Sequence, residues 1–197
     1  HAAARVPGTV NIPLDRSFNT WAGWLIPYDR DFYLIVNDAG CPACIDEAVR
    51  DLAMIGLERI AGWFGVDAID AWRASGQPLE SIAEITPRRL YERLQAGDVT
   101  VVDVRSPSEW ESGHLPGVPN VPLSELIDRL DRLPRDRPVI VHCQSGSRSA
   151  IAASILRSNR FDDVTDMRGG FGAWRHQKLP IETRGRPPHE HSAPPTG

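Results

Sequence analysis

Short apolar runs alternate with segments of helical periodicity through most of the chain. Residues 99–105, 138–142 and 164–167 form apolar runs rich in β-branched side chains, and turn residues border them. Runs of this length and composition predict buried β-strands. Residues 125–130 and 149–156 instead place apolar side chains at helical spacing. Strands that alternate with helices predict an α/β fold, with a doubly wound, mostly parallel sheet flanked by helices.

Capping residues mark where three helices of the second half should begin. Thr86, followed by Pro87, supplies a hydroxyl cap and a proline at the first turn. Ser124 has the same position before residues 125–130. The glycine-rich residues 169–172 should form the turn into a last helix. The second half therefore predicts a complete set of alternating strands and helices.

One six-residue loop lies between the predicted strand 138–142 and the predicted helix 149–156. It consists of Cys143, Gln144, Ser145, Gly146, Ser147 and Arg148. Ligands of a parallel sheet bind beyond the carboxyl ends of its strands, and unpaired N–H groups at a helix start stabilise anions. The loop should therefore fold its backbone N–H groups around the Cys143 sulfur and favour the thiolate. We predict that Cys143 is a nucleophile, accessible to its substrate and with room for a second sulfur atom.

The spacing Cys-x-x-Gly-x-Arg, matched by Cys143, Gly146 and Arg148, resembles the active-site loop of the rhodanese family of sulfurtransferases. The resemblance implies that Cys143 accepts a sulfane sulfur from thiosulfate or a low-molecular-weight persulfide. The cysteine would hold this sulfur as a persulfide and pass it to a thiol acceptor, so that one transfer is split into two steps. We expect no organic cofactor. We also expect no metal site in this chain, because no paired histidines with ligand spacing occur among its six histidines apart from His189 and His191.

The resemblance covers about residues 85–181 and implies roles for the neighbours of the cysteine. Arg148 should orient an anionic donor, and the backbone N–H groups of residues 144–148 should stabilise the sulfur anion. Asp103 and Arg105 end the predicted strand 99–105. They are expected to brace the loop as a structural pair rather than to take part in the chemistry.

Two other functions remain open for the same fold. Phosphatases and arsenate reductases that share it have one more residue between the cysteine and the arginine, because a phosphoryl group needs a wider loop. The four residues between Cys143 and Arg148 disfavour that function. A non-catalytic interaction module is the second alternative, and it would be indicated if Cys143→Ser left every measured activity unchanged.

The first half of the chain resembles a second copy of the same unit. Residues 7–14 align without gaps with residues 116–123, and residues 71–73 match residues 173–175. Two copies of one fold are the simplest explanation of this self-similarity.

The first copy has Asn37 or Asp38 where the second copy has Cys143. Neither side chain can hold a persulfide. We predict a degenerate, N-terminally truncated rhodanese-like repeat over residues 1–80, a complete rhodanese domain over residues 84–183, and a flexible Pro-rich tail over residues 184–197. Within that tail, His189 and His191 are expected to be solvated rather than to bind a metal.

The missing front part of the first repeat, and a start at His1 without methionine, suggest a fragment of a longer protein. A first repeat that lacks the cysteine and contains the segment 20–24 resembles the repeats that follow a metallo-β-lactamase-fold domain in some bacterial proteins. The resemblance implies an upstream partner domain with a metal-dependent hydrolase or persulfide dioxygenase site. This chain would then be its sulfur-supplying arm, and any metal would belong to the missing domain.

Cys41 and Cys44 form a Cys-Pro-Ala-Cys segment just after the predicted strand of the first repeat. A helix start of this kind suits a reversible disulfide or a relay of sulfur. The alternative is two loop cysteines in a decayed active-site turn. A single pair supplies only half of the ligands of a structural zinc site.

Composition limits the classes of partner. The chain has 197 residues and a formal net charge of −4, which gives no reason to expect nucleic acid or an anionic membrane as partner. No apolar stretch approaches the roughly 18 residues of a membrane-spanning helix. Three cysteines, one of them in a reactive loop, fit the reducing cytoplasm better than a disulfide framework. We expect small-molecule partners: a sulfur donor and a thiol acceptor.

Overall fold

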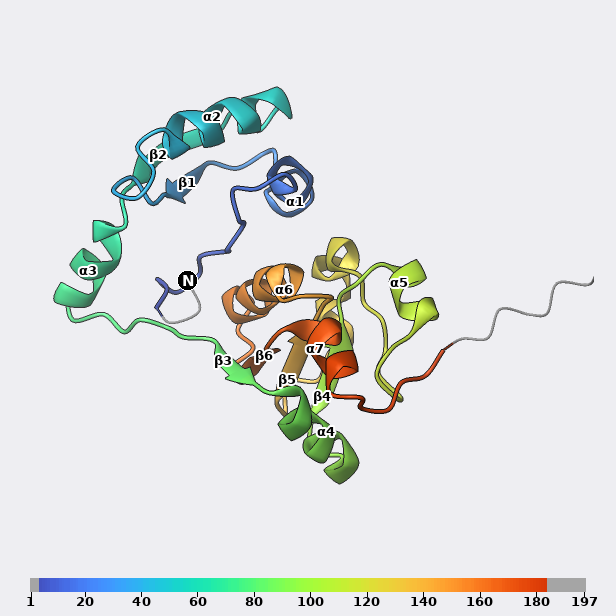
Figure 1. Cartoon of the computed structure of the whole chain (residues 1–197). Helices are drawn as coiled ribbons and strands as arrows, with labels where there is room; N and C mark the ends of the chain where they lie inside the picture. The colour runs from blue at the N-terminus through green and yellow to red at the C-terminus, as the bar shows by residue number, and fades with distance from the viewer. Residues whose placement is uncertain (1–3, 184–197) are drawn as a thin grey trace, which may run out of the picture.

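The computed structural model describes residues 4–183 and contains two α/β units (Figure 1). The second unit has a four-stranded sheet in the order β3-β6-β5-β4, in which all neighbouring strands are parallel. Its strands are β3 (Ala83–Ile85), β4 (Thr100–Asp103), β5 (Val139–His142) and β6 (Val164–Met167). The predicted α/β class, with parallel strands flanked by helices, is therefore confirmed.

Helices cover both faces of this sheet. The elements are α4 (Pro87–Ala96), α5 (Pro107–Ser112), the 3-10 turns η1 (Leu123–Glu125) and η2 (Ile127–Arg132), α6 (Ser147–Ser158) and α7 (Gly170–His176). α4 and α7 pack with Ile140 on one face, whereas α6 packs with Val139 and Val141 on the other. All four residues of β5 are consequently buried, and its carboxyl end leads directly into the predicted active-site loop.

Two of the three predicted helix starts are confirmed, and one is wrong. The Thr86 hydroxyl accepts the Arg89 N–H at 3.4 Å at the start of α4, and α7 begins at Gly170. Residues 125–130 do not form one α-helix capped by Ser124, because Ser124 lies inside η1. Leu123 and Leu126 are both buried. A spacing of three residues suits the 3-10 geometry better than the α-helix.

The first unit is smaller. It contains α1 (Phe18–Leu25), β1 (Phe32–Ile35), α2 (Cys44–Met54), β2 (Ile60–Phe64) and α3 (Asp67–Ala74), and β1 pairs parallel with β2. Both units share one detail: Trp72 Nε1 donates to the Pro78 carbonyl at 3.0 Å, and Trp174 Nε1 donates to the Pro180 carbonyl at 2.8 Å. The matching offset of six residues agrees with the aligned residues 71–73 and 173–175.

The N-terminal segment of the first unit lies along α6 of the second (Figure 1). The Arg5 guanidinium donates to the Ser154 carbonyl at 3.2 Å, and the Asn11 N–H donates to the Ser154 hydroxyl at 2.9 Å. Burial lowers the pKa of Arg5, and the Glu80 carboxylate at 3.5 Å opposes this effect. Arg5 therefore fastens the first unit to a helix 149 residues away in sequence.

No helix within residues 4–183 is both long and apolar enough to cross a bilayer. The predicted flexible tail, with His189 and His191, lies outside the described residues.

Candidate active site

Cys143 lies at the carboxyl end of β5, and Gly146 leads into α6 with φ of 117°. Gly146 N–H donates to Cys143 Sγ at 3.2 Å, and it is the one hydrogen bond to this sulfur within residues 4–183. The predicted ring of several amides around the sulfur is therefore wrong for the free thiol.

The prediction of an accessible thiol is also wrong for this state. Cys143 is a free cysteine with 1% of its surface exposed. It packs in the same apolar cluster as Val141 and Ile151, as a small hydrophobic side chain does. Gln144, Ser145 and Ser147 of the loop are exposed above it. A substrate therefore reaches the sulfur only if this loop moves.

The start of α7 holds the backbone of the loop. Phe171 N–H donates to the Cys143 carbonyl at 2.7 Å, and Gly172 N–H donates to the Gln144 carbonyl at 2.9 Å. Gly170 has φ of +57°, and a Cβ atom there would lie 2.4 Å from the Cys143 carbonyl oxygen. A side chain at Gly170 is thus excluded. The sequence predicted only a turn at residues 169–172, although its glycine doublet is a signal of a close backbone approach.

Asp103 and Arg105 form a buried ion pair beneath this loop. Arg105 Nε lies 3.0 Å from both Asp103 carboxylate oxygens, and Arg105 Nη2 lies 2.6 Å from Oδ2. The same guanidinium donates to Gln144 Oε1 at 3.4 Å and stacks 4.0 Å from the centre of the Phe171 ring. The pair thus links β4 to both the cysteine loop and the start of α7.

His142 is a buried neighbour that the sequence analysis did not single out. Burial lowers its pKa, although the Asp103 carboxylate, 3.6 Å from Nε2, acts in the opposite direction. Its Nδ1 lies 3.4 Å from the Cys143 carbonyl oxygen. A neutral His142 adds no positive charge next to the cysteine.

Arg148 is occupied by a carboxylate. Its two terminal nitrogens each donate to one Glu109 oxygen at 2.7 Å, and this lowers the pKa of Glu109 to about 2. Ser106 holds Glu109 from the other side in a capping box at the start of α5. That Arg148 orients an anionic donor stays a prediction, and α5 brings a carboxylate that neutralises its charge. The sequence alone predicted no role for Glu109.

Asp166 of β6 is a second titratable group near the loop. Burial raises its pKa to about 7, and the nearby Ser149 hydroxyl acts in the opposite direction. The Ser149 hydroxyl donates its hydrogen to the Gly146 carbonyl at 3.1 Å. Asp166 is thus connected through Ser149 to the residue whose N–H contacts the Cys143 sulfur.

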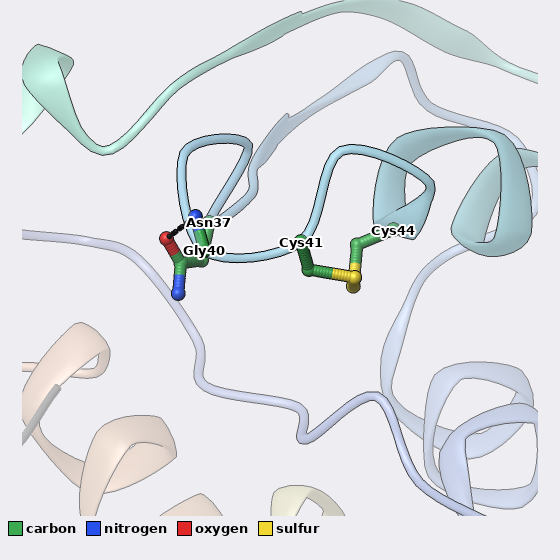
Figure 2. Close-up of a disulfide and its surroundings, with 4 residues drawn as sticks. All are labelled: Asn37, Gly40, Cys41 and Cys44. Carbon is green, nitrogen blue, oxygen red and sulfur yellow. Dashed lines mark hydrogen bonds between the residues drawn. A yellow bond between two sulfur atoms is a disulfide. The ribbon is translucent and has the colours of Figure 1, made fainter.

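Cys41 and Cys44 are joined in a disulfide in the loop that leads into α2 (Figure 2). They belong to the first unit, whereas Cys143 belongs to the second. Within the described residues, no hydrogen bond or ion pair joins this loop to residues 143–148. The redox or relay role of Cys41 and Cys44 stays a prediction, and it is independent of the chemistry at Cys143.

A surface hollow of about 440 Å³ lies elsewhere on the second unit. Its lining residues are Trp110, His114, Gly117, Val118, Pro119, Glu182 and Thr183. None of them belongs to the cysteine loop. Within residues 4–183, no cluster of three or more His, Cys, Asp or Glu residues is arranged to hold a metal ion.

Comparison with known proteins assigns the second unit to a family. The family described as Rhodanese-like domain matches residues 86–177. The uncharacterized protein YqhL of Bacillus subtilis is 40% identical over 96 residues, which cover 49% of this chain and 72% of YqhL. A sulfurtransferase of Allochromatium vinosum is 36% identical over 101 residues, which cover 51% of this chain and 94% of that protein.

A third relative is much longer than the region it shares. The probable adenylyltransferase/sulfurtransferase MoeZ of Mycobacterium tuberculosis is 32% identical over 130 residues, which cover 64% of this chain. The chain spans only 31% of the length of MoeZ.

Proposed function

Because this chain belongs to the rhodanese-like domain family, we propose that its second unit transfers a sulfane sulfur through a persulfide on Cys143. The observation that carries the proposal is the position of the only free cysteine within residues 4–183. It lies at the carboxyl end of β5, with the Gly146 N–H directed at its sulfur. The sulfurtransferase relative of similar length supports this type of reaction at the level of the family.

The transfer takes two displacements at sulfur. The Cys143 thiolate attacks the outer sulfur of the donor, which forms the Cys143 persulfide and releases a thiolate from a persulfide donor or sulfite from thiosulfate. An acceptor thiolate then attacks the outer sulfur and releases the Cys143 thiolate. The Gly146 N–H stabilises negative charge on sulfur in both steps. No cofactor takes part.

Substrate entry requires the loop to open, since Cys143 is buried. Ser145 and Ser147 are exposed, and Gly146 supplies the backbone freedom for opening. Opening at Gln144 must break its bonds from Gly172 N–H and Arg105. Arg148 offers no free positive charge because Glu109 neutralises it. We therefore expect a low-molecular-weight persulfide to be a better donor than the thiosulfate dianion.

The first unit is proposed to be a degenerate repeat without sulfur transfer of its own. The loop after β1 starts at Val36, and neither Asn37 nor Asp38, the positions aligned with Cys143, carries a nucleophilic sulfur. A non-catalytic role for the whole chain is the second candidate, and the burial of Cys143 favours it. The association with an upstream metallo-β-lactamase-fold domain remains a prediction from the sequence.

Intact-mass analysis after incubation with thiosulfate or glutathione persulfide tests the proposal. The expected result is the gain of one sulfur atom that cyanide removes. The Cys143→Ser variant should gain none. If the chain gains no sulfur from either donor, the transfer reaction is refuted and the interaction module is favoured.

A further inference from the structure

The Cys41–Cys44 disulfide is accessible and lies outside the core of the first unit. Both cysteines are partly exposed, and Pro42 and Ala43 between them are exposed. The apolar core of this unit is formed by other residues, among them Phe18 and Leu52. A small reactant can therefore approach this disulfide without unfolding the unit.

Backbone and amide hydrogen bonds hold this loop independently of the disulfide (Figure 2). Asn37 Oδ1 accepts the Gly40 N–H at 3.0 Å, and the Asn37 carbonyl accepts the Cys41 N–H at 2.9 Å. The Cys41 carbonyl accepts the Cys44 N–H at 3.0 Å. None of these bonds needs a closed disulfide, so the loop can keep its shape when the sulfur–sulfur bond opens.

The disulfide is also poorly placed to stabilise the fold. It joins residues only three positions apart. A cross-link stabilises a protein mainly by restricting its unfolded chain, and this effect is smallest for the shortest rings. Two residues between the cysteines therefore leave little structural purpose for the bond, whereas the same spacing is typical of pairs that open and close.

The charges around Cys41 and Cys44 show that the helix start is not what makes this site reactive. Cys44 is the first residue of α2, where helix N–H groups favour negative charge. Asp46 and Glu47 in the same turn already supply negative charge. The helix start therefore gives a thiolate little advantage, and the pairing, the spacing and the access of the two cysteines distinguish this site.

We infer that Cys41 and Cys44 form a dithiol–disulfide exchange site for low-molecular-weight thiols and disulfides. A thiolate attacks one sulfur of the pair, which breaks the disulfide, forms a mixed disulfide and releases the other cysteine as a thiolate. A second thiol then attacks the sulfur of the attached small molecule and releases that cysteine as well. Two thiols become one small disulfide, and the two electrons they give up reduce the pair to two thiols.

This activity goes beyond the proposed sulfur transfer and does not need Cys143. The full chain with Cys143→Ser tests it, because Cys41 and Cys44 are then the only cysteines among the three of the sequence. The variant is incubated under native conditions with millimolar reduced glutathione and then alkylated, and its intact mass is measured by mass spectrometry. We expect two alkyl groups per chain, and their loss when oxidised glutathione is added before alkylation.

A variant with a single cysteine distinguishes exchange by the Cys41–Cys44 pair from simple attachment of glutathione to one thiol. With Cys41→Ser and Cys143→Ser together, the remaining thiol should keep one attached glutathione after treatment with oxidised glutathione. The intact pair should expel that glutathione and close. The far-UV circular dichroism and melting temperature of the Cys143→Ser chain should be nearly the same with the pair open and closed.

Two results would overturn the inference. One is a pair that stays closed in millimolar reduced glutathione under native conditions. The other is opening that unfolds the first unit, which would make the bond a structural cross-link. Sulfur uptake by Cys143 in the Cys41→Ser/Cys44→Ser variant is measured separately, so failure of the sulfur transfer and failure of the exchange site are distinguishable.

Discussion

Gly170→Ala tests whether the start of α7 positions the cysteine loop. The added Cβ would lie 2.4 Å from the Cys143 carbonyl oxygen and 2.8 Å from the Gln144 carbonyl carbon. Both neighbours are backbone atoms that no side-chain rotation can move away. The carbonyl must therefore shift by about 1 Å to reach an ordinary contact, and the bonds from Phe171 and Gly172 weaken.

The expected losses follow from these contacts. Two weakened hydrogen bonds and a non-glycine residue at positive φ together lower the free energy of unfolding by about 2–5 kcal/mol. Displacement of the loop by about 1 Å should slow sulfur loading of Cys143 by up to about 100-fold. Urea unfolding gives the first quantity, and the time course of the mass increase with glutathione persulfide gives the second.

Gly97→Ala is the matched control. Gly97 also has positive φ, of +71°, but a Cβ there would meet nothing within 4 Å. It therefore reports the backbone cost alone, which is about 1 kcal/mol. If Gly170→Ala is no less stable than Gly97→Ala and loads sulfur at the parental rate, the carbonyl contacts do not position the loop.

Three further predictions concern charged groups around the same loop. Glu109→Gln should keep a hydrogen-bond acceptor for Arg148 but leave the Arg148 charge without a neutralising carboxylate. Loading of Cys143 by thiosulfate should therefore rise several-fold relative to loading by glutathione persulfide, and an unchanged ratio would contradict this. Glu92→Gln, which removes the exposed ion pair with Arg89, is the control. Burial raises the pKa of Asp166 to about 7 in the folded protein. The stability that its protonated form contributes is therefore complete below the pKa of Asp166 in the unfolded chain, and it is lost as the pH rises through 7. The free energy of unfolding of the parent, relative to Asp166→Asn, should therefore fall by up to about 4 kcal/mol between about pH 4 and about pH 8, and parallel curves would refute the raised pKa. Arg105→Lys should lower the free energy of unfolding by about 3–5 kcal/mol, because an ammonium group cannot make the several buried hydrogen bonds that the guanidinium makes to the Asp103 carboxylate. A loss below about 1 kcal/mol in urea unfolding would show that the Asp103–Arg105 pair is dispensable for stability.

Local pattern determined the architecture of the second unit and the place of its cysteine. The strand at residues 138–142, the loop with Cys143 and the following helix are neighbours in sequence, and their periodicity and turn residues act over a few positions. The cap at Thr86 was predicted for the same reason. The prediction of an α-helix at residues 125–130 was wrong, because apolar residues spaced by three and by four positions cannot be distinguished over so short a segment.

Only the tertiary structure decided how the cysteine is surrounded. The burial of Cys143, the carboxylate of Glu109 on Arg148, and the approach of Gly170 to the Cys143 carbonyl all join residues from elements far apart in sequence. The seating of Arg5 against α6 spans the two units in the same way. Such contacts depend on how packed helices and strands place their side chains and carbonyls in space, and no periodicity along the chain encodes that placement.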